Sequence, residues 1–167
     1  MRVIKTLRDA LTWELQCLYN AEKQVKDKID MIQSKITSKT LKATLKKYAE
    51  STGNKRVKID RMFSYLSREP KPRINKVMEK LLREAQLQIG PRVSNNMKTL
   101  VLISAFQYTI QYKVSAYKTA LYYALNLELD TVADLLKQII EWEIKTDAAL
   151  KDLTQKEFGN SNAAIWN

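Results

Sequence analysis

The spacing of apolar residues constrains this chain more than any other feature of its sequence. In the first segment, apolar side chains recur in steps of three and four residues, as the buried stripe of an α-helix requires. The same spacing returns in four further segments, and no stretch alternates with the period of two that predicts a strand. The first stripe consists of Leu11, Leu15, Leu18, Val25, Ile29 and Ile32.

Turn-forming residues are scarce, which favours long helices with few connections. The chain has 167 residues, three glycines and three prolines, a size that suits one domain with a core of its own. Pro70 and Pro72 stop the second stripe, and Gly90-Pro91 ends the third. We therefore predict a single domain over residues 1–167, with helices at about 3–34, 38–67, 74–89, 94–127 and 130–155.

The third helix is short, and we expect it to be a crossover that joins the two halves of a bundle. Thr37 or Ser38 can cap the second helix, and Ser94 or Asn95 the fourth. A short loop, a long crossover and another short loop predict an all-α, ferritin-like four-helix bundle. A solenoid of helix pairs is the weaker alternative, because the chain has no repeat of suitable length.

Composition restricts the chemistry and the location that we expect. The chain has no histidine, and its one cysteine, Cys17, lies in an apolar helical stretch, where a small core residue is expected. Without an imidazole base or a glycine-rich phosphate loop, hydrolase and kinase functions are set aside. No stretch has the features of a signal peptide or of a membrane span, and we expect a cytoplasmic protein.

The positive charge is concentrated in one region. The formal net charge is +11, and residues 35–83 contain fifteen Lys or Arg against four Asp or Glu, so the rest of the chain sums to zero. Such a region could bind a nucleic acid or another polyanion, with a strong dependence on salt. A solvated basic face is the alternative. The candidate contact residues are Lys42, Lys46, Lys47, Lys58 and Arg61.

Polar residues interrupt three of the apolar stripes near mid-helix. Glu22 falls on the buried stripe of the first helix, Thr52 and Lys55 interrupt the second, and Glu143 and Asp147 interrupt the last. In an antiparallel bundle, mid-helix positions come to the same level. We therefore predict one polar layer within an otherwise apolar core, in which a buried charge needs a partner or a metal.

This polar layer lacks the ligands of a di-metal site. Such sites use a Glu from each of two helices and a Glu-x-x-His from each of the other two, whereas this chain has no histidine and is expected to offer Ile110 from its third long helix. The Lys55 ammonium would bring positive charge to the place of the metal ions and could pair with Glu22 or Glu143. We expect an ion-paired layer.

Residues 14–24, ELQCLYNAEKQ, resemble the E-L-x-D-L-Y-x-A-E-K-Q opening of the bacterial YciE/YciF family of ferritin-like proteins. The likeness continues through residues 50–52, 116–119 and 135–147 and covers nearly the whole chain. The resemblance implies a ferritin-like bundle that is commonly dimeric and stress-associated, with a di-metal site in members that retain the ligands.

The departures from the family pattern fall on those ligands. Where the family has histidines on the second helix, this chain has Tyr48 and Lys55, and where the family has V-E-H-Y-E on the third long helix, it has TIQYK at 109–113. The resemblance leaves four vestigial metal positions, Glu22, Glu50, Glu143 and Asp147, and assigns Lys55, Thr52 and Gln111 to the polar core that replaces the metal. The acids could still hold one weakly bound Mg²⁺ or Ca²⁺.

Three functions remain open at this point. The favoured one is a non-catalytic bundle that acts through its surface as a homodimer, without a cofactor. The second is a residual ferroxidase or peroxide-consuming enzyme that uses the four acids, and the third is anion or nucleic-acid binding by the basic region. The turn-rich segment 158–167 has an apolar end and is expected to dock on the bundle or on a second subunit.

Overall fold

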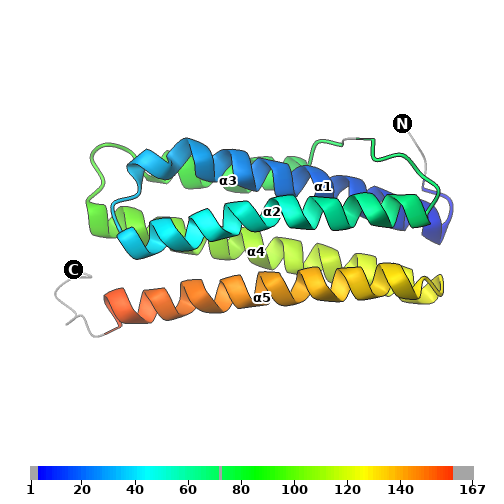
Figure 1. Ribbon diagram of the computed structural model, residues 1–167. Helices are drawn as coiled ribbons and strands as arrows, with labels where there is room; N and C mark the ends of the chain where they lie inside the picture. The colour runs from blue at the N-terminus through cyan, green and yellow to red at the C-terminus, as the bar shows by residue number, and fades with distance from the viewer. Residues whose placement is uncertain (1–3, 72, 160–167) are drawn as a thin grey trace.

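The computed structural model describes residues 4–71 and 73–159, and over these it is a bundle of long helices (Figure 1). No strand occurs in this part of the chain, so the predicted all-α architecture with a short crossover helix is confirmed. The elements are α1 (Leu7–Ile32), a 3₁₀ turn (Gln33–Lys35), α2 (Lys39–Tyr65), α3 (Lys76–Gln88), α4 (Asn95–Asn126) and α5 (Asp130–Phe158).

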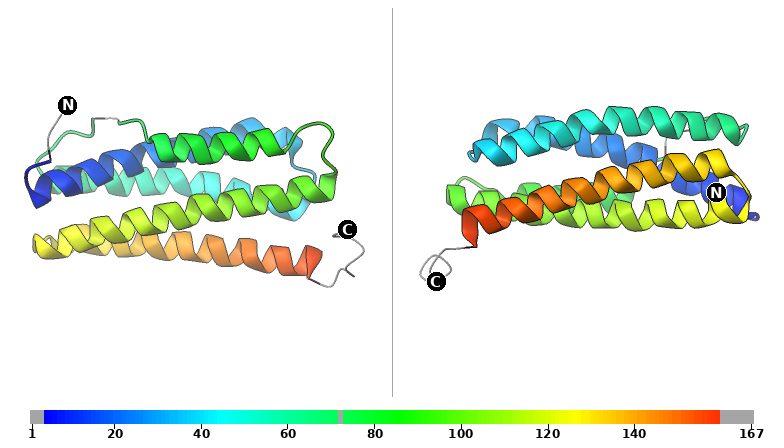
Figure 2. Two further views of the ribbon diagram at one scale, coloured as in Figure 1. Left: turned by 180° about the vertical axis from the view of Figure 1, so that it is seen from behind. Right: turned by 60° about the horizontal axis from the view of Figure 1, so that its bottom comes forward.

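The four long helices form two pairs with opposite directions. Helices α1 and α5 run one way, and α2 and α4 run the other way (Figures 1 and 2). Helix α1 packs against α2 and α4, and α5 packs against the same two helices. The short α3 lies on the outside of the bundle against α1 and α4. Every long helix therefore contributes one side to a common centre.

Local hydrogen bonds explain where the helices begin. Helix α1 starts at Leu7, later than the predicted start near residue 3, because Thr6 forms a capping box: its Oγ1 accepts from the Asp9 amide at 3.1 Å, and Asp9 Oδ2 accepts from the Thr6 amide at 3.2 Å. Of the predicted caps, Ser38 and Ser94 are the ones used. Helix α5 continues to Phe158, three residues beyond the predicted end.

Asn75 fastens the crossover helix to the bundle. Its side chain is almost fully buried, and its Oδ1 caps α3 by accepting from the Met78 amide at 2.9 Å. Its Nδ2 donates to the Cys17 carbonyl oxygen at 3.2 Å and to the Tyr112 hydroxyl at 3.0 Å, and its amide donates to Asn20 Oδ1 at 2.8 Å. Cys17, predicted to be a core residue, is half-buried beside this contact.

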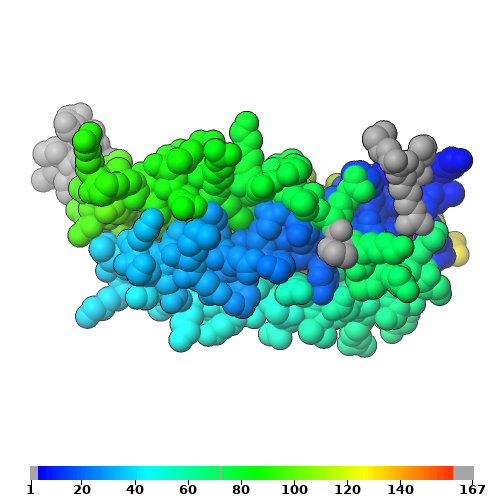
Figure 3. Space-filling model, turned by 90° about the horizontal axis from the view of Figure 1, so that it is seen from above, coloured from blue at the N-terminus to red at the C-terminus, as the bar shows by residue number. Residues whose placement is uncertain are grey.

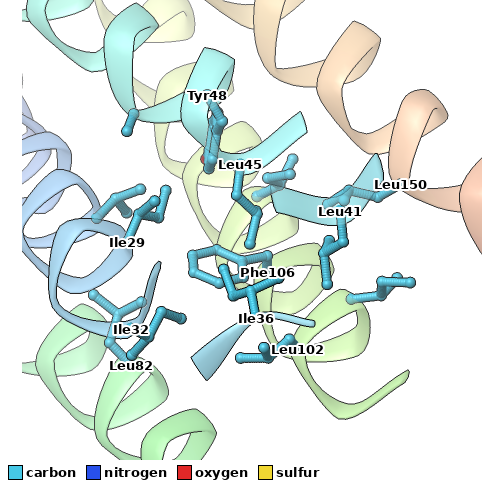
Figure 4. Packing of buried hydrophobic residues seen from close by; sticks show 14 of the residues in the cluster. Ile29, Ile32, Ile36, Leu41, Leu45, Tyr48, Leu82, Leu102, Phe106 and Leu150 are labelled. Atoms are coloured by element: carbon cyan, nitrogen blue, oxygen red, sulfur yellow. The ribbon is translucent and has the colours of Figure 1, made fainter. Parts of the chain in front are cut away.

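The apolar core is divided into two parts along the bundle axis. One part lies towards the α1–α2 connection and includes Ile29, Leu45 and Phe106 (Figure 4). The other lies towards the opposite end and includes Leu15 and Leu136. The mid-helix polar residues fall between these two parts, which is why the sequence shows interrupted stripes and not continuous ones.

Phe158 belongs to the first apolar core, but residues 160–167 of the C-terminal segment lie outside the described part, and so does the question of where that segment docks. Among the helices that the structure describes, none is both long and apolar enough to cross a membrane.

Candidate functional site: a buried lysine–glutamate centre

Four charged side chains meet between the two apolar cores, one from each long helix. They are Glu22 on α1, Lys55 on α2, Lys113 on α4 and Glu143 on α5, and each has 0% of its surface exposed. Two ammonium groups face two carboxylates, so the formal charge of the cluster is zero. Because a buried ion is stable only when it is paired, the neutrality of this cluster is the condition for its burial.

The Lys113 ammonium lies at the middle of the cluster. Its Nζ is 2.7 Å from Glu22 Oε1 and 2.7 Å from Glu143 Oε1, so one lysine joins carboxylates from two other helices. Nitrogen–oxygen distances of this size are those of charge-assisted hydrogen bonds. Lys113 therefore connects α1, α4 and α5 through one atom.

Lys55 completes the ion-paired layer from the fourth helix. Its Nζ is 2.5 Å from Glu143 Oε1, the same oxygen that Lys113 contacts. The predicted contact between Lys55 and one of the two glutamates is thus present, and Glu143 is the partner. Both ammonium nitrogens also lie over the ring of Tyr48, at 4.6 Å for Lys55 and 4.9 Å for Lys113 from the ring centroid, distances at which a ring face attracts a cation.

Two buried tyrosines supply further hydrogen bonds to the carboxylates. The Tyr48 hydroxyl donates to Glu143 Oε2 at 2.9 Å, and the Tyr117 hydroxyl donates to Glu22 Oε1 at 2.6 Å. Glu143 thereby has partners on both oxygens. Glu22 Oε2 has none within the described part of the chain.

The two lysines differ in how strongly the folded protein favours their charge. Burial lowers the pKa of the Lys113 ammonium, but Glu143 and Glu22 outweigh burial and raise this pKa above its ordinary value. For Lys55, burial is again the largest effect, and the positive charge of Lys113 adds to it, so the pKa of Lys55 is lowered despite both glutamates. The difference arises because Lys113 contacts two carboxylates and Lys55 only one.

The acidic groups respond in the opposite sense. Burial raises the pKa of Glu143, but Lys113 and Lys55 together outweigh burial and hold this pKa below its ordinary value. Burial followed by the negative charges of the two glutamates raises the pKa of Tyr48 and of Tyr117 well above the ordinary value. Both tyrosines are therefore neutral donors, and Glu143 is an ionised acceptor, at neutral pH.

The other residues predicted for this site do not join the charged cluster. Glu50 is exposed on α2. Gln111, predicted for the polar core, is also exposed, and its Nε2 donates to Asp147 Oδ2 at 2.9 Å near the surface. Thr52 is fully buried as predicted, but its hydroxyl donates to the Ala49 carbonyl oxygen at 2.7 Å. Of the four predicted acids, only Glu22 and Glu143 come together.

The sequence interpretation missed the contribution of α4. It placed Ile110 at the level of the charged layer, whereas Lys113 and Tyr117 provide the contacts there and Ile110 belongs to the adjoining apolar core. The signal was present, because Phe106, Ile110, Lys113 and Tyr117 follow one another in steps of four, three and four residues. The apolar neighbour Val114 fits the same stripe, so the spacing alone does not distinguish Lys113 from it.

The residues present do not fit a di-metal centre. The two carboxylates that converge are both engaged by ammonium nitrogens at 2.7 Å or less. Within residues 4–71 and 73–159, no three Asp, Glu, Cys or His side chains are grouped so that they could hold an ion. A single Mg²⁺ or Ca²⁺ would likewise need Asp147 beside the two glutamates, and Asp147 lies with Gln111 instead.

Comparison with known proteins agrees with this bundle. Residues 6–163 match the family described as "Domain of unknown function (DUF892)". Protein YciF of Escherichia coli strain K12 is 29% identical over 151 residues, which cover 90% of this chain and 91% of YciF. The predicted resemblance to the YciE/YciF family is thereby confirmed.

Solved structures show the same fold. The crystal structure of the E. coli stress protein YciF matches with a TM-score of 0.90 at 27% identity, over 95% of this chain and 100% of that one. YcfI from Rhodopseudomonas palustris matches with a TM-score of 0.86 at 22% identity, over 90% of this chain and 96% of that one. The ferritin-like arrangement of the helices, predicted from the order of loops and crossover, is confirmed.

Removing one charge from the cluster is expected to destabilise the protein far more than removing a balanced pair. Lys113→Met leaves two buried carboxylates with one ammonium and should lower the free energy of unfolding by about 3–5 kcal/mol. Lys113→Met combined with Glu22→Gln keeps the Lys55–Glu143 pair balanced and should lose clearly less. Urea unfolding measures both, with Lys118→Met, an exposed lysine of the same helix, as the control. Equal losses in the single and paired variants would contradict the charge-balance argument.

The charged layer should also make stability depend on acid pH. Because the fold lowers the pKa of Glu143 from its ordinary value of 4.5, the ionised carboxylate stabilises the folded protein at every pH above 4.5. This stabilisation is lost as the pH falls through the lowered pKa of the folded state. Urea unfolding at pH 7 and at several values below 4.5 should show a smaller acid loss in the Lys55→Met/Glu143→Gln variant than in the unmodified protein. Glu50→Gln, at an exposed position, is the control. If the paired variant lost as much unfolding free energy at acid pH as the unmodified protein, Glu143 would not be the source of that loss.

Proposed function

The chain belongs to the DUF892 family, and from this membership we propose that it is a non-catalytic ferritin-like protein in which two lysine ammonium groups take the place of a di-metal centre. One observation carries the proposal: Lys55 and Lys113 bind the two buried glutamates directly, from two different helices. A positive charge fixed at this point repels a metal cation and occupies the oxygens that would bind it.

A residual ferroxidase or peroxide-consuming enzyme is the second candidate, and the same geometry speaks against it. That function would use Glu22, Glu50, Glu143 and Asp147 as iron ligands, but Glu50 is exposed and Asp147 is hydrogen-bonded to Gln111 away from the cluster. Two carboxylates without an imidazole are too few for two irons. The non-catalytic function is therefore the one we propose.

Without catalysis in the bundle centre, the proposed protein acts through contacts of its outer surface. E. coli YciF is described as a stress protein, and the likeness to it supports a stress-associated role for this chain. A bundle that needs no metal to fold would keep its structure when iron is scarce or is bound by other ligands. This independence of iron is what distinguishes the proposed protein from a metal-bearing bundle of the same fold.

Self-association is part of the proposal, and α4 is the helix that best supports it. Its outer side carries Tyr108, Tyr122 and Leu125, which are exposed by 66%, 63% and 50%. The 32-residue helix has no acidic residue; of its three lysines Lys113 is buried, Lys98 lies in the first turn, and the exposed Lys118, four residues before Tyr122, is the charge on this side. Two copies of a chain with a net charge of +11 repel one another except where their facing surfaces carry few charges. We propose a homodimer formed through this side of α4.

Metal titration tests the loss of the di-metal centre. Metal-free protein titrated with Fe²⁺ or Co²⁺ should show no tight binding, whereas Lys55→His combined with Lys113→Glu adds an imidazole and a carboxylate next to Glu22 and Glu143. The double variant should gain a visible Co²⁺ absorption band and a melting temperature that rises with Co²⁺ concentration. Because its three acids are uncompensated without metal, circular dichroism should check its fold.

The matched control for this titration is Lys42→His combined with Lys118→Glu. It makes the same chemical changes at two exposed positions and should not show the Co²⁺ band. Two irons bound per chain and rapidly oxidised by the unmodified protein would overturn the proposed function.

Sedimentation equilibrium tests the proposed dimer. The unmodified chain should have twice the mass of one chain, and Tyr108→Glu combined with Tyr122→Glu should give a monomer, because carboxylates on both faces would have to be desolvated against each other. The control is Tyr65→Glu on α2, at a tyrosine that is 49% exposed, which should remain a dimer. A dimer that survives the α4 changes would place the interface elsewhere.

A further inference from the structure

A pocket with three cationic side chains lies at the end of the bundle where α1 gives way to the 3₁₀ turn and α3 gives way to α4. Its volume is about 610 Å³, within the range of small-molecule sites. Figure 3 shows this end of the molecule, with the green α3 and the loop after it beside the blue end of α1. Lys35, Arg83 and Lys98 line it together with the apolar Leu87, Ile89 and Pro91.

The lining of this pocket holds cations without an acidic residue among them. No ion pair within the described residues involves Lys35, Arg83 or Lys98. Arg83 also borders two neighbouring depressions on α3, whose linings include Asp27, Glu79 and Glu84, but none of these acids lines the pocket itself. The lining of the pocket therefore carries three positive charges and no negative one.

Two neighbouring features add to the positive potential. Lys28 lies next to the pocket, where its Nζ donates to Oε1 of the lining residue Gln86 at 2.6 Å. The pKa of Lys28 is lowered, first by burial and second by the positive charge of Lys35, which shows that the two ammonium groups lie close enough to repel each other. Helix α4 begins at Asn95 and has no acidic residue in its first turn, where Lys98 lies. The Ser94 hydroxyl accepts from the Met97 amide at 3.4 Å, and the partial positive charge of the helix start remains beside Lys98.

We propose that this pocket binds a condensed phosphate group, a pyrophosphate or triphosphate that is either free or carried by a nucleotide. Three cations in a lining without acidic residues match a ligand with several adjacent negative charges better than they match a single carboxylate or monoanion. The apolar part of the lining holds no aromatic side chain on which a base could stack, so the phosphate chain is the recognised group.

This site is separate from the buried lysine–glutamate centre and does not depend on the proposed loss of the metal. The sequence predicted anion binding by the basic region 35–83 as a whole, and the proposal places this binding at one end of the bundle. It also adds Lys98, which lies outside that region of the sequence.

Isothermal titration calorimetry with sodium tripolyphosphate, in a phosphate-free buffer of low ionic strength, tests the site. The unmodified protein should bind one tripolyphosphate per chain in a saturable manner, and the affinity should fall as salt is added. Arg83→Gln and Lys98→Gln should each weaken binding at least tenfold. Lys42→Gln and Lys46→Gln remove the same charge from exposed positions on α2 and should change the affinity less than twofold.

A parallel titration with ATP separates the two sources of the ligand. Equal affinity for ATP and tripolyphosphate would support recognition of the phosphate chain alone, and tighter binding of ATP, lost in the same two variants, would support a nucleotide. The proposal is overturned by the absence of saturable binding at low salt, or by control variants that weaken binding as much as the pocket variants do. Duplex DNA that binds through α2 while tripolyphosphate does not bind would also overturn it.

Discussion

The contact of one ammonium group with carboxylates from two other helices governs how this bundle is assembled. Lys113 on α4 lies 2.7 Å from both Glu22 on α1 and Glu143 on α5, and Glu143 is shared with Lys55 on α2. Sliding any of these helices by one turn, about 5.4 Å, would break a contact of this length and leave a buried ion without a partner. The charged layer thus fixes the register of all four long helices, a task that the two apolar cores alone specify less strictly.

Charge balance also explains why the charged layer contains only two acids. A di-metal bundle site has four glutamates, whose charge matches that of two divalent cations. Two lysines supply half of that positive charge, and so only two carboxylates can be buried beside them. Glu22 and Glu143 are those two. A further carboxylate in the centre would be an uncompensated buried charge, and at positions 110 and 113 this chain has Ile and Lys, where the family pattern has glutamates.

The sequence predicted the fold more completely than it predicted the charged layer, and the reason is physical. Helical periodicity reports which residues are buried, so Glu22, Lys55 and Glu143 could be placed in the core from their positions on the stripes. Only the family resemblance indicates Glu50 as a site residue. It lies two residues from both Tyr48 and Thr52, about 200° around the helix from each, and therefore points outward.

Lys113 could have been found by the same periodicity, since it continues the stripe through Phe106 and Ile110. What periodicity cannot supply is the partner of each charge, because that depends on how far each helix is displaced along its neighbours. The Asn75 contacts are a second example. They join residues separated by 37 to 58 positions in the chain, and no pattern within one helix indicates them.

The neutrality of the centre has a consequence for the surface, because the buried charges of the described residues cancel and contribute nothing to the net charge of +11. In the proposed homodimer, that charge disfavours contact over most of the surface, and the side of α4 with Tyr108 and Tyr122 is where we propose that two copies meet. The cationic pocket lies at the start of the same helix. Lys98 is ten residues from Tyr108, about 15 Å along the helix axis, which exceeds the screening length of about 8 Å at physiological salt. An anion in the pocket would therefore change the local potential without altering the electrostatics of the proposed dimer face, and the two proposed surfaces can act independently.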